Sequence, residues 1–164
     1  MEESLKEIFR KIYEGEAKAV LRLRAFARIA QDEGLPQIAH LFRAVAASEE
    51  IHGIRALRRL GLLKDTEANL KASFESESEV AGKAYAEFLK MATELGDEGA
   101  VKIFSQSRDV EDTHAELYKR ALSHFMEERE TTYYVCKVCG YVSDGTLPDT
   151  CPVCGAKSAQ FESL

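Results

Sequence analysis

Two short motifs in this sequence pair a glutamate with a histidine three residues later: Glu49 with His52, and Glu111 with His114. On a helix, residues three apart lie on the same face, so both side chains of a pair can bind one metal ion. A single motif of this kind is a weak signal, because an isolated inward-facing histidine is more often a hydrogen-bonded core residue. The interpretation therefore depends on the helices that carry these motifs.

Glycine and proline divide the first 130 residues into four segments of helical length. The breaks are DEGLP at 32–36, LGLLKDTEAN at 60–69 and ELGDEG at 94–99, and the polar stretch MEERETT at 126–132 is typical of a linker. The segments between the breaks are rich in alanine, leucine, glutamate, lysine and arginine, which favour helix. Amphipathic helices of this length with short connections predict a mostly α protein with a four-helix bundle over residues 1–130.

A glutamate interrupts the apolar stripe near the middle of each predicted helix. Buried together without a cation, four carboxylates would cost more than the stability of an ordinary domain. Carboxylate oxygens combined with imidazole nitrogens in this order suit a pair of iron or manganese ions. The predicted ligands of this di-metal site are Glu16, Glu49, His52, Glu77, Glu111 and His114.

The acids next to this set are expected to face solvent. Glu75 and Glu79 are each four residues from a lysine, as in ordinary ion pairs on a helix surface, and Asp112 and Glu116 lie off the apolar stripe. Tyr118 lies on the stripe, and its role is left open between core packing, with its hydroxyl bonded to a buried carboxylate, and a redox or proton-donor function.

The four cysteines of the chain lie in CKVCG at 136–140 and CPVCG at 151–155. Each motif places two thiolates across a tight turn, and the glycine that follows can adopt a positive φ. Two such knuckles predict one tetrahedral four-sulfur site, which fits either iron or zinc. We expect residues 131–164, called the ribbon below, to pack around Tyr133, Tyr134 and Phe161.

The composition limits the classes of partner. The chain has 164 residues, of which 45% are hydrophobic, and a net charge of −6, which argues against a nucleic-acid or anionic-membrane surface. It contains no stretch of about 20 apolar residues that would span a membrane. The segment MEESLKEIFRKIYEGE is charged and amphipathic rather than secretory, so we expect a cytoplasmic protein with reduced cysteines.

The ligand order Glu, Glu-x-x-His, Glu, Glu-x-x-His, followed by two Cys-x-x-Cys-Gly knuckles, resembles the rubrerythrin family over nearly the whole chain. The segments that carry the resemblance are YEGEAKA, EEIHG, NLKASFESES, EDTHAELY, YVCKVCGY and CPVCGA. It implies a ferritin-like bundle whose six predicted ligands hold two iron ions and are the catalytic residues. It also implies a rubredoxin-like domain with one iron, or zinc as a substitute, held by Cys136, Cys139, Cys151 and Cys154.

The resemblance further implies an activity and partners. The activity is reduction of hydrogen peroxide to water in oxidative-stress defence, with electrons passing from a reductase or a rubredoxin-type donor through Fe(Cys)₄ to the di-iron site. We do not expect the ribbon to fold against the middle of its own bundle. The resemblance accordingly implies a head-to-tail homodimer in which each ribbon lies near the partner's di-iron centre.

Val80 departs from the family pattern, in which a second glutamate usually stands three residues after the third-helix ligand. In the family, that carboxylate is associated with one iron exchanging a histidine for a glutamate between redox states, and valine is unable to bind iron. Oxidation of Fe(II) by O₂, as in a ferroxidase, or reduction of O₂ is therefore an alternative activity. A third hypothesis is a non-catalytic, metal-stabilised module whose ribbon binds a partner.

Overall fold

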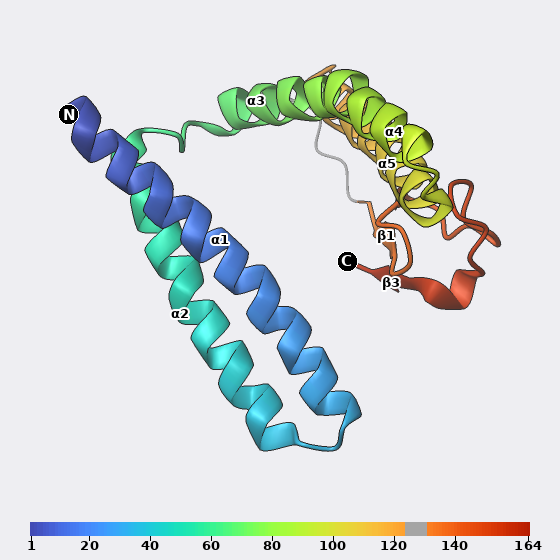
Figure 1. Cartoon of the computed structure of the whole chain (residues 1–164), viewed down its shortest axis with the longest axis horizontal. Coiled ribbons are helices and arrows are strands. Elements are labelled where there is room, and N and C mark those ends of the chain that lie inside the picture. The colour runs from blue at the N-terminus through green and yellow to red at the C-terminus, as the bar shows by residue number, and fades with distance from the viewer. Residues whose placement is uncertain (124–130) are drawn as a thin grey trace. The chain divides into compact units, whose positions relative to one another are not determined.

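The computed structural model describes residues 1–123 and 131–164, and residues 126–130 of the predicted linker lie outside this part (Figure 1). Contacts within the chain divide it into two compact units, Met1–Lys64 and Asp65–Leu164, which are described one at a time. The division falls inside the predicted bundle. None of the helices described is long and apolar enough to cross a membrane.

The first unit is a pair of long helices, α1 (Glu3–Asp32) and α2 (Pro36–Leu60), which lie side by side (Figure 1). Proline at the first position of α2 costs no hydrogen bond, and Gly61, with a φ of +70°, ends the helix in the left-handed conformation. Small side chains let the two backbones approach closely. The buried residues of the pair are Ala27, Ala30, Ala39, Ala46, Gly53 and Ala56.

The second unit begins with a long helical run that a π-helix interrupts. It comprises α3 (Thr66–Glu79), the π-helix η1 (Val80–Ala84) and α4 (Tyr85–Glu94), and all three segments pack against α5 (Glu98–Ser123). The side chains of Asp65 and Asp97 accept hydrogen bonds of 2.9 Å from the backbone N–H groups of Ala68 and Ala100, which caps α3 and α5. The predicted helix breaks are confirmed, whereas η1 was not anticipated.

The ribbon completes the second unit with three short antiparallel strands in the order β2-β1-β3. These are β1 (Tyr133–Cys136), β2 (Val142–Asp144) and β3 (Phe161–Ser163), with a 3₁₀ turn η2 (Ser158–Gln160) before β3. Phe161 packs edge-on against Tyr141 at 6.5 Å between ring centroids. The predicted aromatic core is therefore wrong in part, because Tyr141 is the partner of Phe161 and Tyr133 remains 40% exposed.

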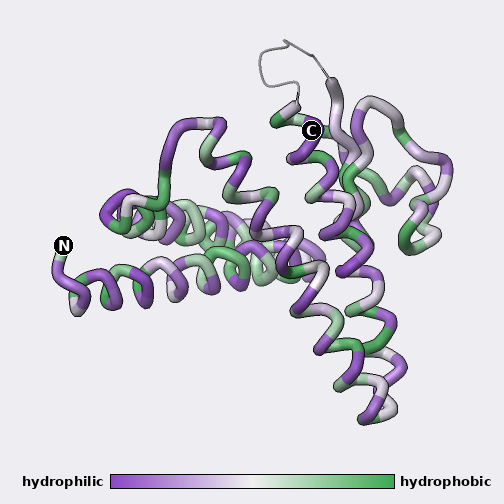
Figure 2. The backbone as a smooth tube through the Cα atoms, turned by 90° about the horizontal axis from the view of Figure 1, so that it is seen from above, coloured by the Kyte–Doolittle hydropathy of each residue, from purple (hydrophilic) through white to green (hydrophobic). Residues whose placement is uncertain are grey.

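Hydrophobic and hydrophilic residues alternate along every helix, as expected of amphipathic helices (Figure 2). The helical register confirms the predicted faces of the acids around Glu77: this side chain is half-buried, whereas Glu75 and Glu79 are exposed. Glu79 also forms the expected surface ion pair with Lys83, at 3.5 Å. The 3.6-residue period is thus sufficient to select the inward-facing acid from three alternating glutamates.

Candidate metal centres

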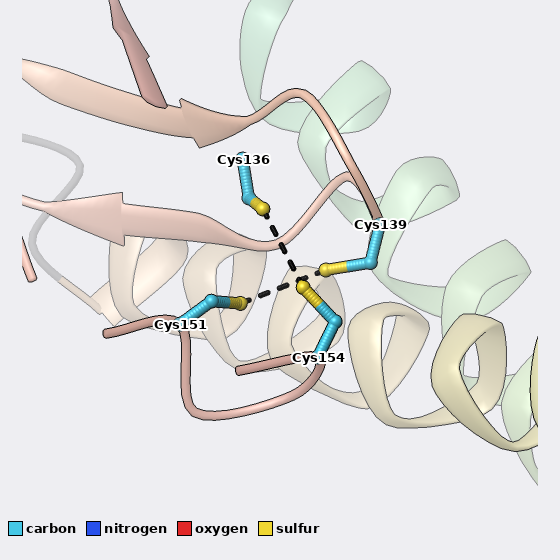
Figure 3. A group of neighbouring side chains, drawn as sticks. All are labelled: Cys136, Cys139, Cys151 and Cys154. Carbon is cyan, nitrogen blue, oxygen red and sulfur yellow. Dashed lines mark hydrogen bonds between the residues drawn. The ribbon is translucent and has the colours of Figure 1, made fainter. Parts of the chain in front are cut away.

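The four cysteine sulfurs converge between the two knuckles of the ribbon (Figure 3). The Sγ atoms of Cys136 and Cys154 are 3.7 Å apart, and those of Cys139 and Cys151 are 3.6 Å apart. Four sulfurs at about 2.3 Å from a tetrahedrally coordinated ion are separated by about 3.8 Å, so the observed spacing fits a metal. All four cysteines are free thiols, as predicted.

The backbone of each knuckle has the conformation that the sequence predicts. Gly140 and Gly155 have φ values of +85° and +76°, and each donates its N–H to the carbonyl of the first cysteine of its knuckle at 2.9 Å. This conformation favours glycine because a β-carbon would be strained there. The turns also direct the N–H groups of Val138 and Cys139 toward the sulfur of Cys136.

The thiols of the ribbon differ in acidity. Burial raises the pKa of Cys139 and Cys154. Burial opposes ionisation of Cys136 as well, but hydrogen bonds from the N–H groups of Cys139 and Val138 outweigh it and lower its pKa. Burial therefore favours the protonated thiols of Cys139 and Cys154, and a metal must displace these protons to bind.

Glu16, Glu49 and His52 form a first carboxylate group, which lies within the first unit. The Nδ1 atom of His52 is 2.9 Å from Oε2 of Glu49 and 3.8 Å from Oε1 of Glu16. A β-carbon at Gly53 would lie 3.5 Å from the β-carbon of Glu16, so glycine allows α1 and α2 to approach closely at the level of the ligands. The His52 side chain is 49% exposed.

Glu77, Glu111 and His114 form a second carboxylate group, which lies within the second unit. The Nδ1 atom of His114 is 3.1 Å from Oε2 of Glu111, and both side chains are about three-quarters buried, with 26% and 23% of their surface exposed. Burial and the neighbouring Glu111 carboxyl raise the pKa of Glu77. The Nε2 atom of His114 is buried and has no hydrogen-bond partner among the described residues.

Both carboxylate groups fit a metal ion. The ligand atoms of each group lie within 4.8 Å of one another, which is slightly more than the separation of about 4 Å that two ligands of one first-row ion can have, so a small movement of the side chains would bring them to one ion. In each group, the Nδ1 atom of the histidine faces the glutamate three residues before it. The prediction that all six residues hold one di-metal site involves both units together and stays a prediction.

The neighbourhood of the second carboxylate group contains features that the sequence analysis missed. The π-helix η1 begins at Val80, three residues after Glu77, and Val80 is half-buried. π-helices occur frequently at functional sites. Asp112 and Glu116 are exposed on α5, as predicted.

The ribbon packs against α5 of its own chain. A β-carbon at Gly140 would lie 3.9 Å from Cγ1 of Val110, and Arg120 is 3.9 Å from a carboxylate oxygen of Asp144. The expectation that the ribbon does not fold against the middle of its own bundle involves both units together and stays a prediction.

The comparisons with known proteins cover both the helical part of the chain and the ribbon. The family model for rubrerythrin matches residues 7–122, and the model for the rubrerythrin rubredoxin-like domain matches residues 134–162. Nigerythrin of Nitratidesulfovibrio vulgaris is 32% identical, over 85% of this chain and 76% of the relative. Rubrerythrin of the same organism is 30% identical, over 93% of this chain and 90% of the relative.

Solved structures support the same relationship. Nigerythrin in a partially reduced state matches with a TM-score of 0.61 and 27% identity, over 97% of this chain and 86% of that chain. The predicted fold class is confirmed: the helices of a ferritin-like bundle are followed by a small rubredoxin-like metal ribbon. The chain therefore belongs to the rubrerythrin family, whose members combine a di-iron site with a rubredoxin-like four-cysteine site.

Proposed function

We propose that this protein is a peroxidase that reduces hydrogen peroxide to water, with electrons relayed through its four-cysteine site. The observation that carries this proposal is the presence, in one chain, of a four-sulfur group and two groups of carboxylate and imidazole ligands. Four sulfur ligands suit an iron ion that carries one electron at a time, whereas zinc in the same site would be redox-silent. Each peroxide consumes two electrons and two protons and yields two molecules of water.

Residues 1–130 then act as the di-iron domain and residues 131–164 as the electron-transfer domain. The first and second carboxylate groups together would hold two iron ions, which would supply the electrons for cleavage of the O–O bond. The chain orients these ions through the Nδ1 atoms of His52 and His114, which face Glu49 and Glu111. With Nδ1 bound to metal, the ring proton of each imidazole would lie on Nε2.

The proposed partners are a reductase or rubredoxin-type protein that donates single electrons, and a second copy of the chain. A cytoplasmic location keeps the four thiols reduced and available for metal. Light scattering tests the homodimer: a monomer that retains full peroxidase activity with a rubredoxin-type donor would contradict it.

A second candidate activity is oxidation of Fe(II) or reduction of O₂. The observation that favours it is Val80, which is half-buried one turn after Glu77 and has no donor atom. Its isopropyl group makes the surroundings of Glu77 more apolar than a second carboxylate would, and it leaves six protein ligands in the proposed di-iron site.

Anaerobic stopped-flow spectroscopy separates the two activities. Protein purified without added metal is analysed for iron and zinc, reduced fully, and mixed with either hydrogen peroxide or O₂. For a peroxidase, we expect peroxide to restore the visible absorption of the ferric four-cysteine site faster than O₂ does. Faster oxidation by O₂ would favour the second candidate, and zinc in the native ribbon would overturn the electron relay.

A further inference from the structure

The first unit has no core of large side chains. Every buried residue in it is alanine or glycine. Helices in proteins are stabilised mainly by packing of an apolar face, so two helices joined only through small residues need further elements against them. Larger apolar side chains of α1 and α2 remain 39–59% exposed at Ile12, Phe26, Ile29, Ile38, Leu41 and Ile51.

The first carboxylate group is incomplete as a di-metal site. Glu16, Glu49 and His52 supply three ligand residues from two helices, and the His52 side chain is 49% exposed. In ferritin-like di-iron proteins, the ligands come from all four helices of one bundle. The residues that complete the first group are therefore those of the second group, on α3 and α5.

The connection between α2 and α3 is too short to bring both groups of one chain into one ferritin-like bundle. In that fold the second and third helices run parallel, and a long crossover joins the end of one to the start of the other. Glu49 lies 11 residues before the end of α2 at Leu60. Glu77 lies 11 residues after the start of α3 at Thr66.

These offsets set the length that a crossover needs. With Glu49 and Glu77 at one level of the bundle, the end of α2 and the start of α3 are about 33 Å apart along its axis. The chain from Leu60 to Thr66 extends to at most about 22 Å. A second unit that covers the first in this fold must therefore come from another copy of the chain.

The charges of the two units favour such an assembly. The first unit contains 12 basic and 9 acidic residues, whereas the second contains 10 basic and 19 acidic residues. The first unit is thus basic and the second strongly acidic. The first unit of one copy is therefore electrostatically complementary to the second unit of another.

We propose that two copies of the chain exchange their helix pairs. The first unit of one copy forms a four-helix bundle with the second unit of the other, so that Glu16, Glu49 and His52 share a di-iron site with the second carboxylate group of the partner subunit. The dimer contains two such bundles, each built from both chains. This inference rests on the proposed di-iron site and adds which chain supplies each half of it.

A heterodimer of two variants tests the exchange without reference to activity. Glu49→Ala and Glu111→Ala chains are co-expressed with different affinity tags, and the heterodimer is purified through both tags and loaded with Mn(II). In an exchanged dimer, one bundle carries both substitutions and the other carries neither. We expect the electron paramagnetic resonance signal of two coupled Mn(II) ions at about half the wild-type intensity, and no such signal from either variant alone.

The matched control is a heterodimer of Glu16→Ala with Glu49→Ala. Both substitutions lie in the first unit, so every bundle of an exchanged dimer carries one of them and no coupled signal is expected. A Glu49→Ala and Glu111→Ala heterodimer that also lacks the signal would overturn the exchange, because the substitutions then act within separate single-chain sites.

Photo-crosslinking tests the exchange in the metal-free protein. Val20, half-buried on α1 one turn after Glu16, is replaced by a photo-reactive phenylalanine analogue in the full-length chain. We expect a product with the mass of two chains, in which mass spectrometry locates the bond in residues 66–123 of the partner. Any other result, including a product with the mass of one chain, would contradict the proposal.

The two experiments separate failure of the exchange from failure of the function. If the wild type gives no coupled Mn(II) signal, the proposed di-metal site is wrong, while the crosslink still reports whether the helices are exchanged. If the wild type gives the signal and the heterodimer does not, the exchange is wrong and the proposed function is unaffected. Circular dichroism of each variant establishes that its helices are intact.

Discussion

The two carboxylate groups share one sequence pattern and differ in their surroundings. In the first group, the His52 side chain is 49% exposed and lies between two helices joined by a short turn. In the second, the His114 side chain is 26% exposed, a π-helix begins three residues after Glu77, and the ribbon covers the neighbouring face of α5. The same ligands are thus placed once in an open setting and once in a shielded setting.

This difference indicates a division of roles within the proposed di-iron site. A shielded group beside the ribbon is suited to receive electrons, because exclusion of water strengthens the electrostatic interactions around it. Matching substitutions in the two groups can therefore test whether the groups differ in function.

The largest expected effect is loss of metal from either group. Glu49→Ala and Glu111→Ala should each lower the metal content of the helices by at least one ion, because each removes the carboxylate that faces a histidine Nδ1 atom. Elemental analysis measures this content, and Glu116→Ala, at a side chain that is 64% exposed on α5, is the control. Retention of both ions in Glu111→Ala would show that Glu111 is not needed to hold metal.

Replacement of the two histidines should sharpen the comparison. His52→Ala and His114→Ala should each lower the metal affinity of their group. The loss should be at least as large as that caused by removing a residue that hydrogen-bonds to a metal ligand, which is about 10–100-fold. Only His114→Ala should also slow oxidation of the ribbon in protein reloaded with excess iron, because only His114 lines the pocket that the ribbon covers. Equal effects of both variants on the ribbon would show that the two groups do not differ in electron delivery.

Val80→Glu adds a carboxylate one turn after Glu77. If the missing carboxylate limits the activity, the variant should turn over hydrogen peroxide faster than the wild type and react more slowly with O₂.

In the wild type, we expect His52 to remain bound to metal in both redox states. Crystal structures of the oxidised and reduced forms check this prediction. An iron ion that dissociates from His52 on a change of redox state, without a carboxylate replacing the imidazole, would contradict it.

Glu77→Gln should stabilise the metal-free protein at neutral pH. The folded-state pKa of Glu77 is raised by burial and by Glu111, so the wild type loses stability as the pH rises through that pKa, while the unfolded chain ionises at about pH 4. Urea unfolding of chelator-treated protein at two pH values measures the difference. The exposed Glu79→Gln variant should retain the wild-type pH dependence, and a Glu77→Gln variant that also retains it would contradict the assigned burial.

The smallest expected effect concerns the helix caps, which also differ between the units. The side chain of Asp65 caps α3, whereas neither α1 nor α2 has a side-chain cap. Asp65→Ala should therefore reduce the free energy of unfolding by about 1 kcal/mol, measured by denaturant titration. Asp65→Asn keeps an accepting oxygen and should restore most of the loss.

Much of the candidate site was predictable because its geometry is local. Three glutamates at 75, 77 and 79 point in different directions on any helix, so the 3.6-residue period alone selects Glu77 as the buried one. The i, i+3 spacing likewise brings Glu111 next to His114 before any tertiary contact forms. The positive φ of Gly140 and Gly155 follows from the turn that each cysteine pair requires.

Sequence by itself thus determined which candidate ligands come together within each group and the faces that carry them, because backbone periodicity and turn chemistry act over a few residues. Only the tertiary structure decided that Gly140, rather than Gly155, lies close to a helix, and that His114 is better shielded than His52. Both knuckles have the same Cys-x-x-Cys-Gly sequence and the same turn, so the local sequence does not distinguish them. The choice depends on interactions between residues far apart in sequence, such as the ion pair of Arg120 with Asp144. These interactions are individually weak and stabilise one docked position only in sum.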